Sequence, residues 1–116
     1  MNRGNQQGKR KDIYKDIAVN NSLRKNARKV QACYNAFIQK KPTKTDGFVE
    51  FDWIILPKGK VKKAELIASN LQDTTLNDCI LNIIRNIEFP PTPTGFETYM
   101  TYKYHFKKAV DEKKTQ

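Results

Sequence analysis

Apolar residues recur with a helical period in two separate parts of the chain. In residues 23–40 they follow the spacing i, i+4, i+7, i+11 and i+14, which aligns them on one helix face. Pro42 ends this helix, because proline cannot continue the backbone hydrogen-bond ladder. A second helix begins behind an N-cap at Asp73 or Thr74. The two apolar stripes consist of Leu23, Ala27, Val30, Tyr34 and Phe37, and of Leu76, Ile80, Ile83, Ile84 and Ile87.

A shorter helical signal precedes the first of these helices. Ile13, Tyr14 and Ile17 are spaced for one or two helical turns, and the residues Asn20 to Ser22 follow them. Asparagine and serine favour caps and turns over helix interiors, so we expect this stretch to break or cap the short segment.

Between the two helices the pattern changes to the alternation of a β-hairpin. The first strand runs from Gly47 to Ile55, and Gly59 in the turn 57–60 is free to adopt a positive φ. A second strand spans residues 61–69, with a bulge expected around Lys62 and Lys63. The predicted inward residues are Val49, Phe51, Trp53 and Ile55 in the first strand, and Ala64, Leu66 and Ala68 in the second.

The chain ends in a third strand that is rich in aromatic residues. The segment 89–93 holds three prolines, which forbid a helix and force an extended connection. The strand then spans residues 96–107. Phe96, Met100, Tyr102, Tyr104 and Phe106 share the inner face with Thr98, and Glu97, Tyr99, Lys103 and His105 occupy the other.

The element order αββαβ predicts an α+β domain over residues 12–107. The second helix returns the chain so that the third strand pairs antiparallel with the first and runs parallel to the second. The expected sheet is therefore three-stranded and antiparallel or mixed, of order 2-1-3, with both helices on one face. Residues 1–11 are polar and read as a disordered linker or the end of a fragment, and residues 108–116 as a frayed tail.

The charge of the 116-residue chain is concentrated near its N-terminus. Of the net charge of +10, residues 1–41 contribute +9, with eleven Lys and Arg against two acids. Such a basic arm attracts nucleic acid, anionic lipid or an acidic protein, or it is simply a solvated surface. It comprises Lys9, Arg10, Lys11, Arg24, Lys25, Arg28 and Lys29. No apolar run has the ~20 residues of a membrane span, and no signal peptide is visible at the start.

The two cysteines, Cys33 and Cys79, lie at the flanks of the two helical stripes. From spacing alone they are two separate thiols, a redox couple, half of a metal site or a disulfide. There is no CxxC motif, and the lone His105 cannot complete a tetrahedral zinc site with them. If both helices pack on one face of the sheet, a disulfide is geometrically possible.

No motif for catalysis, a cofactor or a metal is present. The chain lacks a glycine-rich phosphate loop, HExxH and GxSxG. Glu50 and Asp52 share a strand face, but such a pair more often marks a wet sheet surface than an acid/base site. We therefore expect a protein that is not an enzyme and that needs no cofactor.

Residues 28–106 resemble the AgmX/PglI C-terminal family, a TonB-C-like domain of Gram-negative envelope proteins. The resemblance is carried by Cys33-Tyr34, Pro42, the run Gly47-x-Val49-x-Phe51-x-Trp53-x-Ile55, Pro57-x-Gly59-x-Val61, Ser69-x-Leu71, Leu76-x-x-Cys79-Ile80, Phe89-Pro90-x-x-Pro93 and Tyr102-x-Tyr104-x-Phe106. It implies a TonB C-terminal-like fold, a Cys33–Cys79 disulfide and a periplasmic location. TonB-like proteins are usually anchored in the inner membrane by an N-terminal helix, so we expect the chain to be a fragment of such a protein, the alternative being a truncated relative.

The function expected from this resemblance is to couple an inner-membrane complex to a periplasmic or outer-membrane protein partner. The process served is energy transduction, transport or gliding motility. The domain is expected to be a monomer or a weak dimer. Strand addition would use the last strand, an exposed sheet edge. Its expected residues are Phe96, Thr98, Tyr99, Met100, Thr101, Tyr102, Lys103 and Tyr104. Phe48, Glu50, Asp52, Ile54, Ile67 and His105 would form the outer sheet face. The alternative is a cytoplasmic nucleic-acid-binding module that uses the basic arm and first helix. Under the leading interpretation, the domain has no nucleic acid as a partner.

Overall fold

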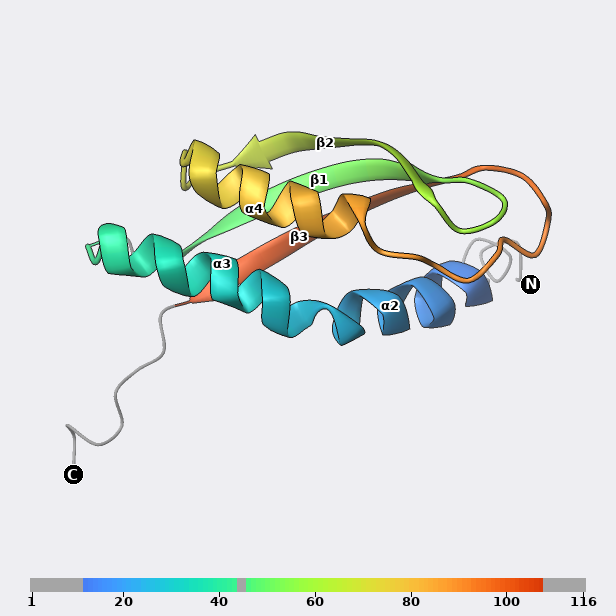
Figure 1. Ribbon diagram of the computed structural model, residues 1–116, viewed down its shortest axis with the longest axis horizontal. Helices are drawn as coiled ribbons and strands as arrows, with labels where there is room; N and C mark the ends of the chain where they lie inside the picture. The colour runs from blue at the N-terminus through green and yellow to red at the C-terminus, as the bar shows by residue number, and fades with distance from the viewer. Residues whose placement is uncertain (1–11, 44–45, 108–116) are drawn as a thin grey trace, which may run out of the picture.

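The computed structural model describes residues 12–43 and 46–107, which form a three-stranded sheet with helices across one face (Figure 1). The strands are β1 Asp46–Ile55, β2 Val61–Ser69 and β3 Thr98–Lys107. Their order is β2-β1-β3, and β1 is antiparallel to both neighbours. The predicted α+β topology and sheet order are confirmed. The predicted linker 1–11 and tail 108–116 lie outside the described residues.

The inner face of the central strand β1 forms the middle of the core. Its alternate side chains, Val49, Phe51, Trp53 and Ile55, are at most 1% exposed. They lie beneath helices α3 Ala27–Lys40 and α4 Thr74–Arg85, which Figure 1 shows running across the sheet. The helices contribute Val30, Tyr34, Phe37, Leu76, Ile80 and Ile84 to the same cluster. The two apolar periods therefore meet in one core, as the sequence predicts.

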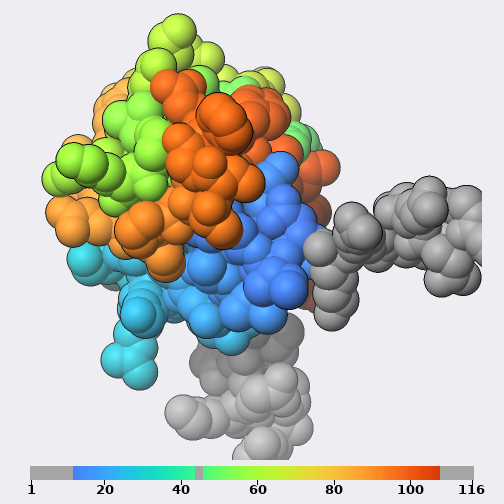
Figure 2. Space-filling model, turned by 90° about the vertical axis from the view of Figure 1, so that its right-hand side faces the viewer, coloured from blue at the N-terminus to red at the C-terminus, as the bar shows by residue number. Residues whose placement is uncertain are grey.

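The N-terminal helical segment is longer than predicted. It begins with a π-helical turn, η1 Tyr14–Val19, and continues as α2 Asn20–Lys25. The wider π turn places Tyr14 and Val19, five residues apart, in the core together. Space-filling Figure 2 shows this segment packed against the chain near residue 90, where the Tyr14 hydroxyl donates to the Pro90 carbonyl at 2.7 Å.

The predicted helix break at Asn20–Ser22 is wrong, since the break occurs at Asn26 instead. The Asn26 side chain donates to the Ser22 carbonyl at 2.9 Å, and its backbone leaves the helical region at φ −102° and ψ 5°. Leu23 stays buried because α2 packs on the core, whereas Ala27, predicted as part of the buried stripe, is exposed. The break therefore separates two helices that a single period had joined.

Strand β2 contains the predicted bulge and a second irregularity. Lys63 has a φ of 54°, and the pairing with β1 shifts between Asp52 and Ile54. It shifts again between Glu50 and Phe51, which places Ala68 opposite Glu50 on the outer face. The prediction of an inward Ala68 is therefore wrong, because one extra residue in a strand reverses the face of those beyond it. Leu66 is opposite Phe51, but it is 38% exposed in this edge strand.

The hairpin turn is docked onto the segment that follows α4. Gly59 has a φ of 101°, and its carbonyl accepts a hydrogen bond from the Phe89 amide at 3.0 Å. The Thr92 amide donates to the Pro57 carbonyl at 3.0 Å. A Cβ atom at Gly59 would collide with the Phe89 carbonyl oxygen, so this position requires glycine on two grounds.

Replacing Gly59 by alanine should therefore lower the free energy of unfolding by about 2–4 kcal/mol, the combined cost of a positive φ and a backbone collision. Gly95→Ala is the matched control: its φ is 78°, but nothing lies within 4 Å of an added Cβ, so only about 1–2 kcal/mol should be lost. Urea unfolding measures both. Equal losses would show that the contact with Phe89 contributes nothing.

Asp73 caps α4 with its side chain, as predicted. Its Oδ1 accepts from the Leu76 amide at 2.8 Å, and its Oδ2 lies 3.3 Å from Lys41 Nζ. The Leu76 hydrogen bond, assisted by Lys41, lowers the pKa of the Asp73 carboxyl. A depressed folded pKa adds stability that is complete above the unfolded value and is lost as the pH falls through the folded one.

Asp73→Ala should accordingly reduce stability by about 1 kcal/mol at neutral pH. The difference from wild type should shrink as the pH falls from about 4, the pKa of an unperturbed Asp in the unfolded chain, through the lowered pKa of the folded carboxyl. Asp73→Asn keeps a capping oxygen without the charge, so its loss of stability at pH 7 should be smaller than that of Asp73→Ala. The loss in Asp73→Asn is due to the missing charge, so it should shrink as the pH falls. Unfolding at pH 7 and pH 3 measures these differences, and a deficit independent of pH in both variants would contradict the role of the carboxylate.

Candidate interaction surface

Strand β3 is a long and regular free edge of the sheet. It pairs with β1 over ten consecutive positions, from Ile55 opposite Thr98 to Asp46 opposite Lys107, without a register shift. Among the described residues no strand pairs with its other side. The opposite edge, β2, carries two register shifts, and such irregularities discourage further pairing. Of the two edges, β3 is therefore the one built to accept another strand.

Of the residues predicted for this edge, Phe96 is not in the strand. It is 73% exposed in the turn before β3, which begins at Thr98. The Thr92 hydroxyl donates to the Phe96 carbonyl at 2.9 Å, and the Phe96 amide donates to the Thr94 hydroxyl at 3.3 Å. These local bonds occupy the backbone groups that would otherwise extend the strand. The other predicted edge residues, Thr98 to Tyr104, lie in β3 as expected.

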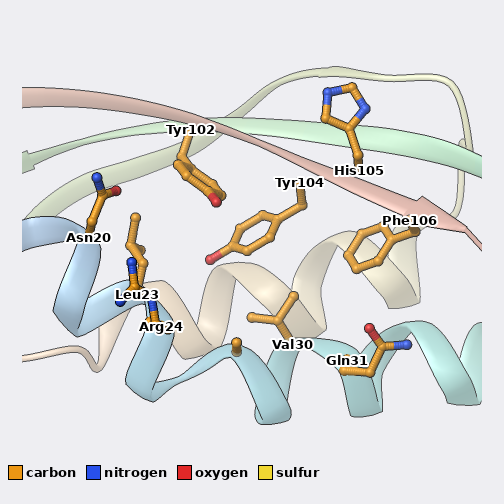
Figure 3. A pocket seen from close by; sticks show the side chains of 10 residues that line it. Asn20, Leu23, Arg24, Val30, Gln31, Tyr102, Tyr104, His105 and Phe106 are labelled. Carbon is orange, nitrogen blue, oxygen red and sulfur yellow. The ribbon is translucent and has the colours of Figure 1, made fainter. Parts of the chain in front are cut away.

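A groove of about 520 Å³ follows the inner side of this edge. Tyr102, Tyr104 and Phe106 reach from β3 toward the helices, whereas His105 points away from them (Figure 3). The opposite wall is one face of α2 and α3. It consists of the apolar side chains Leu23, Ala27 and Val30, flanked by the polar side chains Asn20, Arg24 and Gln31.

The aromatic wall of the groove is continuous. The rings of Tyr102 and Tyr104 meet edge to face at 4.8 Å between centroids, and Tyr34 of α3 stacks on Phe106 at 4.6 Å. The Tyr104 hydroxyl is buried and has no hydrogen-bond partner among the described residues. Burial raises the pKa of Tyr104, and the nearby Tyr102 adds to this effect. A neutral hydroxyl donor without an acceptor is therefore buried in the wall of the groove.

The outer face of the sheet mixes charged and apolar side chains, several of which interact with one another. Glu50 is opposite Lys103, whereas Asp52 is opposite Thr101. Lys103 Nζ lies 4.7 Å from the centre of the Phe48 ring. The Tyr99 hydroxyl donates to Asp52 Oδ2 at 2.8 Å, and this bond is the main reason that the pKa of Tyr99 is raised. The predicted face residues Ile54 and His105 also lie here, and Ile67, 47% exposed, lies at the β2 irregularity.

Four basic residues of the predicted arm lie on helices α2 and α3. Arg24, Lys25, Arg28 and Lys29 are exposed on α2 and α3, and Arg24 lines the groove itself. The predicted arm residues Lys9, Arg10 and Lys11 lie outside the described residues. Within residues 12–43 and 46–107, no group of three or more His, Cys, Asp or Glu side chains gathers as a metal site. No helix of that part is long and apolar enough to cross a membrane.

Cys33 of α3 and Cys79 of α4 are joined by a disulfide. Their Cα atoms are 5.9 Å apart, within the range that a disulfide spans. Cys33 is buried, while Cys79 is exposed. The bond fixes the two covering helices to each other and so holds in place the helix that forms one wall of the groove.

Comparison with known proteins adds little beyond the fold. The chain matches no family model and no curated protein sequence. Among solved structures it is similar to the solution structure of the TonB C-terminal domain of Helicobacter pylori. The two are 17% identical with a TM-score of 0.49, over 75% of this chain and 84% of that one. At this level the similarity assigns no function, and the topology described above rests on the strand pairing alone.

Reduction of the disulfide should lower the free energy of unfolding by about 4 kcal/mol, from the chain entropy of closing a loop between residues 46 positions apart. Urea unfolding with and without reductant measures this difference. The double variant Cys33→Ala, Cys79→Ala is the control and should be insensitive to reductant. Trapping of free thiols before mass spectrometry should modify neither cysteine unless the protein is first reduced, and modification without reduction would contradict the bond.

Proposed function

We propose that this domain is a non-enzymatic interaction module of the bacterial periplasm, which binds an extended segment of an envelope protein along β3. The observation that carries the proposal is the unbroken free edge of β3, ten residues long and without a bulge. Strand addition gives affinity through main-chain hydrogen bonds and gives selectivity through alternate side chains. Both requirements are met at β3, where a side-chain groove runs beside the free backbone.

The disulfide supports a periplasmic location, because such bonds persist in oxidising compartments. The motifs from Cys33 to Phe106 that resemble the AgmX/PglI C-terminal family support the same location. On this basis the domain belongs to a protein anchored in the inner membrane. It couples a complex there to a periplasmic or outer-membrane partner in energy transduction, transport or gliding motility. The alternative, a cytoplasmic nucleic-acid-binding module, requires reduced cysteines and is less consistent with the Cys33–Cys79 bond.

Site-specific photocrosslinking in the native organism tests the proposed edge. A photoreactive phenylalanine analogue at Tyr99, Thr101 or Lys103 should yield adducts with the same envelope protein, because these exposed side chains flank a strand added to β3. The analogue at Glu65 or Leu66, exposed on the opposite edge β2, is the matched control and should yield none. The adducts are identified by mass spectrometry.

Adducts from β2 in place of β3 would contradict the proposed edge. Recovery of the protein with its cysteines reduced, in a cytoplasmic fraction, would contradict the proposed location. Binding to single-stranded DNA that weakens steeply with salt would instead favour the nucleic-acid alternative, since salt dependence follows from contacts to phosphates.

A further inference from the structure

We infer that the groove between β3 and helices α2 and α3 selects the partner, and that it fits an extended peptide with alternating apolar side chains and one carboxylate. This inference rests on the proposed strand addition at β3 and specifies the chemistry of the strand that is added. It follows from the shape of the groove, from its charge and from the unpaired hydroxyl within it.

The shape suits alternate side chains of one strand. Successive side chains of a strand point to opposite faces, so every second side chain of an added strand would enter the groove beside Tyr102, Tyr104 and Phe106. From Tyr102 to Phe106 the wall is about 13 Å long at the rise of a β-strand, which accommodates two or three alternate side chains. The helix wall opposite them is apolar at its centre, and Ala27 contributes only a small side chain to it.

The charge of the groove calls for an acid. Arg24 lines it and has no ion-pair partner among the described residues. Residues 20–43 contain six Lys and Arg and no Asp or Glu, so no acid of this helical stretch balances that charge. The Tyr104 hydroxyl is directed at the helix wall on the side of Leu23 and Arg24 (Figure 3), and it lacks an acceptor. A carboxylate between Arg24 and Tyr104 would satisfy both groups.

A second copy of the chain fits this site poorly. Antiparallel pairing of two β3 edges centred on His105 would bring Lys103 of each copy against Lys107 of the other. A partner of opposite charge avoids this repulsion, so we assign the groove to an acidic peptide segment and not to self-association.

Three synthetic peptides test the inference on the full, oxidised chain. Each alternates valine and threonine over ten residues, flanked by Gly-Ser pairs, and one central valine is replaced by glutamate, glutamine or lysine. NMR shifts of the backbone amides locate binding, and fluorescence anisotropy gives the affinities. The glutamate peptide should bind at β3 and should bind ~5-fold more tightly than the lysine peptide, as expected for a partly exposed ion pair.

Variants separate the groove from the bare edge. Arg24→Glu should reverse the order of the glutamate and lysine peptides, whereas Lys25→Glu makes the same change of charge next to the groove and should leave the order unchanged. Tyr104→Phe should remove part of the preference for glutamate over glutamine, with no loss of stability, because the lost hydroxyl has no partner. Ala27→Trp should fill the groove and weaken all three peptides, while Ala32→Trp, on an exposed part of α3, should not.

The failures are distinguishable. Equal affinities for the three peptides with shifts along β3 would overturn the assignment of the groove and leave strand addition standing. Binding that shifts amides elsewhere, or no binding by any peptide, would overturn the assignment of the groove together with its basis at β3. A dimer that forms through β3 as the protein is concentrated would show that a second copy is the occupant, and it would overturn the inference as well.

Discussion

The uninterrupted register between β1 and β3 is the constraint on which the rest of the structure depends. Side chains alternate across a strand, so a slip of one residue would move Lys103 and His105 to the inner side and expel Tyr104 and Phe106. The register is fixed by what β3 buries, since Phe106 lies in the core and Met100 and Tyr104 pack against it. The same pairing leaves the other side of β3 free. The register between β1 and β3 thus produces both the free edge of β3 and the aromatic wall of the groove.

Sequence patterns predicted the parts of the fold that depend on strong periodicity. The alternation from Val49 to Ile55 placed the first strand, and the return of the chain through the second helix placed that strand in the middle of the sheet. Structural features that depend on single residues could not be predicted from this periodicity. The break at Asn26 arises from one side-chain bond to Ser22, and the reversed face of Ala68 arises from one extra residue in β2. Neither alters the average hydrophobic pattern, so neither leaves a signal in it.

The candidate site was predictable only in part, for a related reason. Topology alone identifies β3 as an edge, because a strand placed last beside β1 has one side free. Periodicity assigned Tyr102 and Tyr104 to the core, although Tyr102 is 36% exposed and Tyr104 borders a groove. A hydrophobic pattern reports which face a side chain occupies and not whether a helix covers that face. The helix cover is incomplete beside β3, where the small residue Ala27 is among those that line the groove.

The disulfide gives this incomplete cover a consequence for binding. The helix wall of the groove belongs to α2 and α3, and α3 is tied to α4 by the Cys33–Cys79 bond as well as held to β3 by the stacking of Tyr34 on Phe106. Because these contacts already fix the position of α3, no ligand is needed to place this wall of the groove. Binding to a preformed groove avoids the entropic cost of ordering it, and an extended peptide already loses much of its own freedom on adding to a sheet. The covalent tie between the helices and the open edge of the sheet are therefore parts of one arrangement, in which rigidity on the helical side permits recognition at β3.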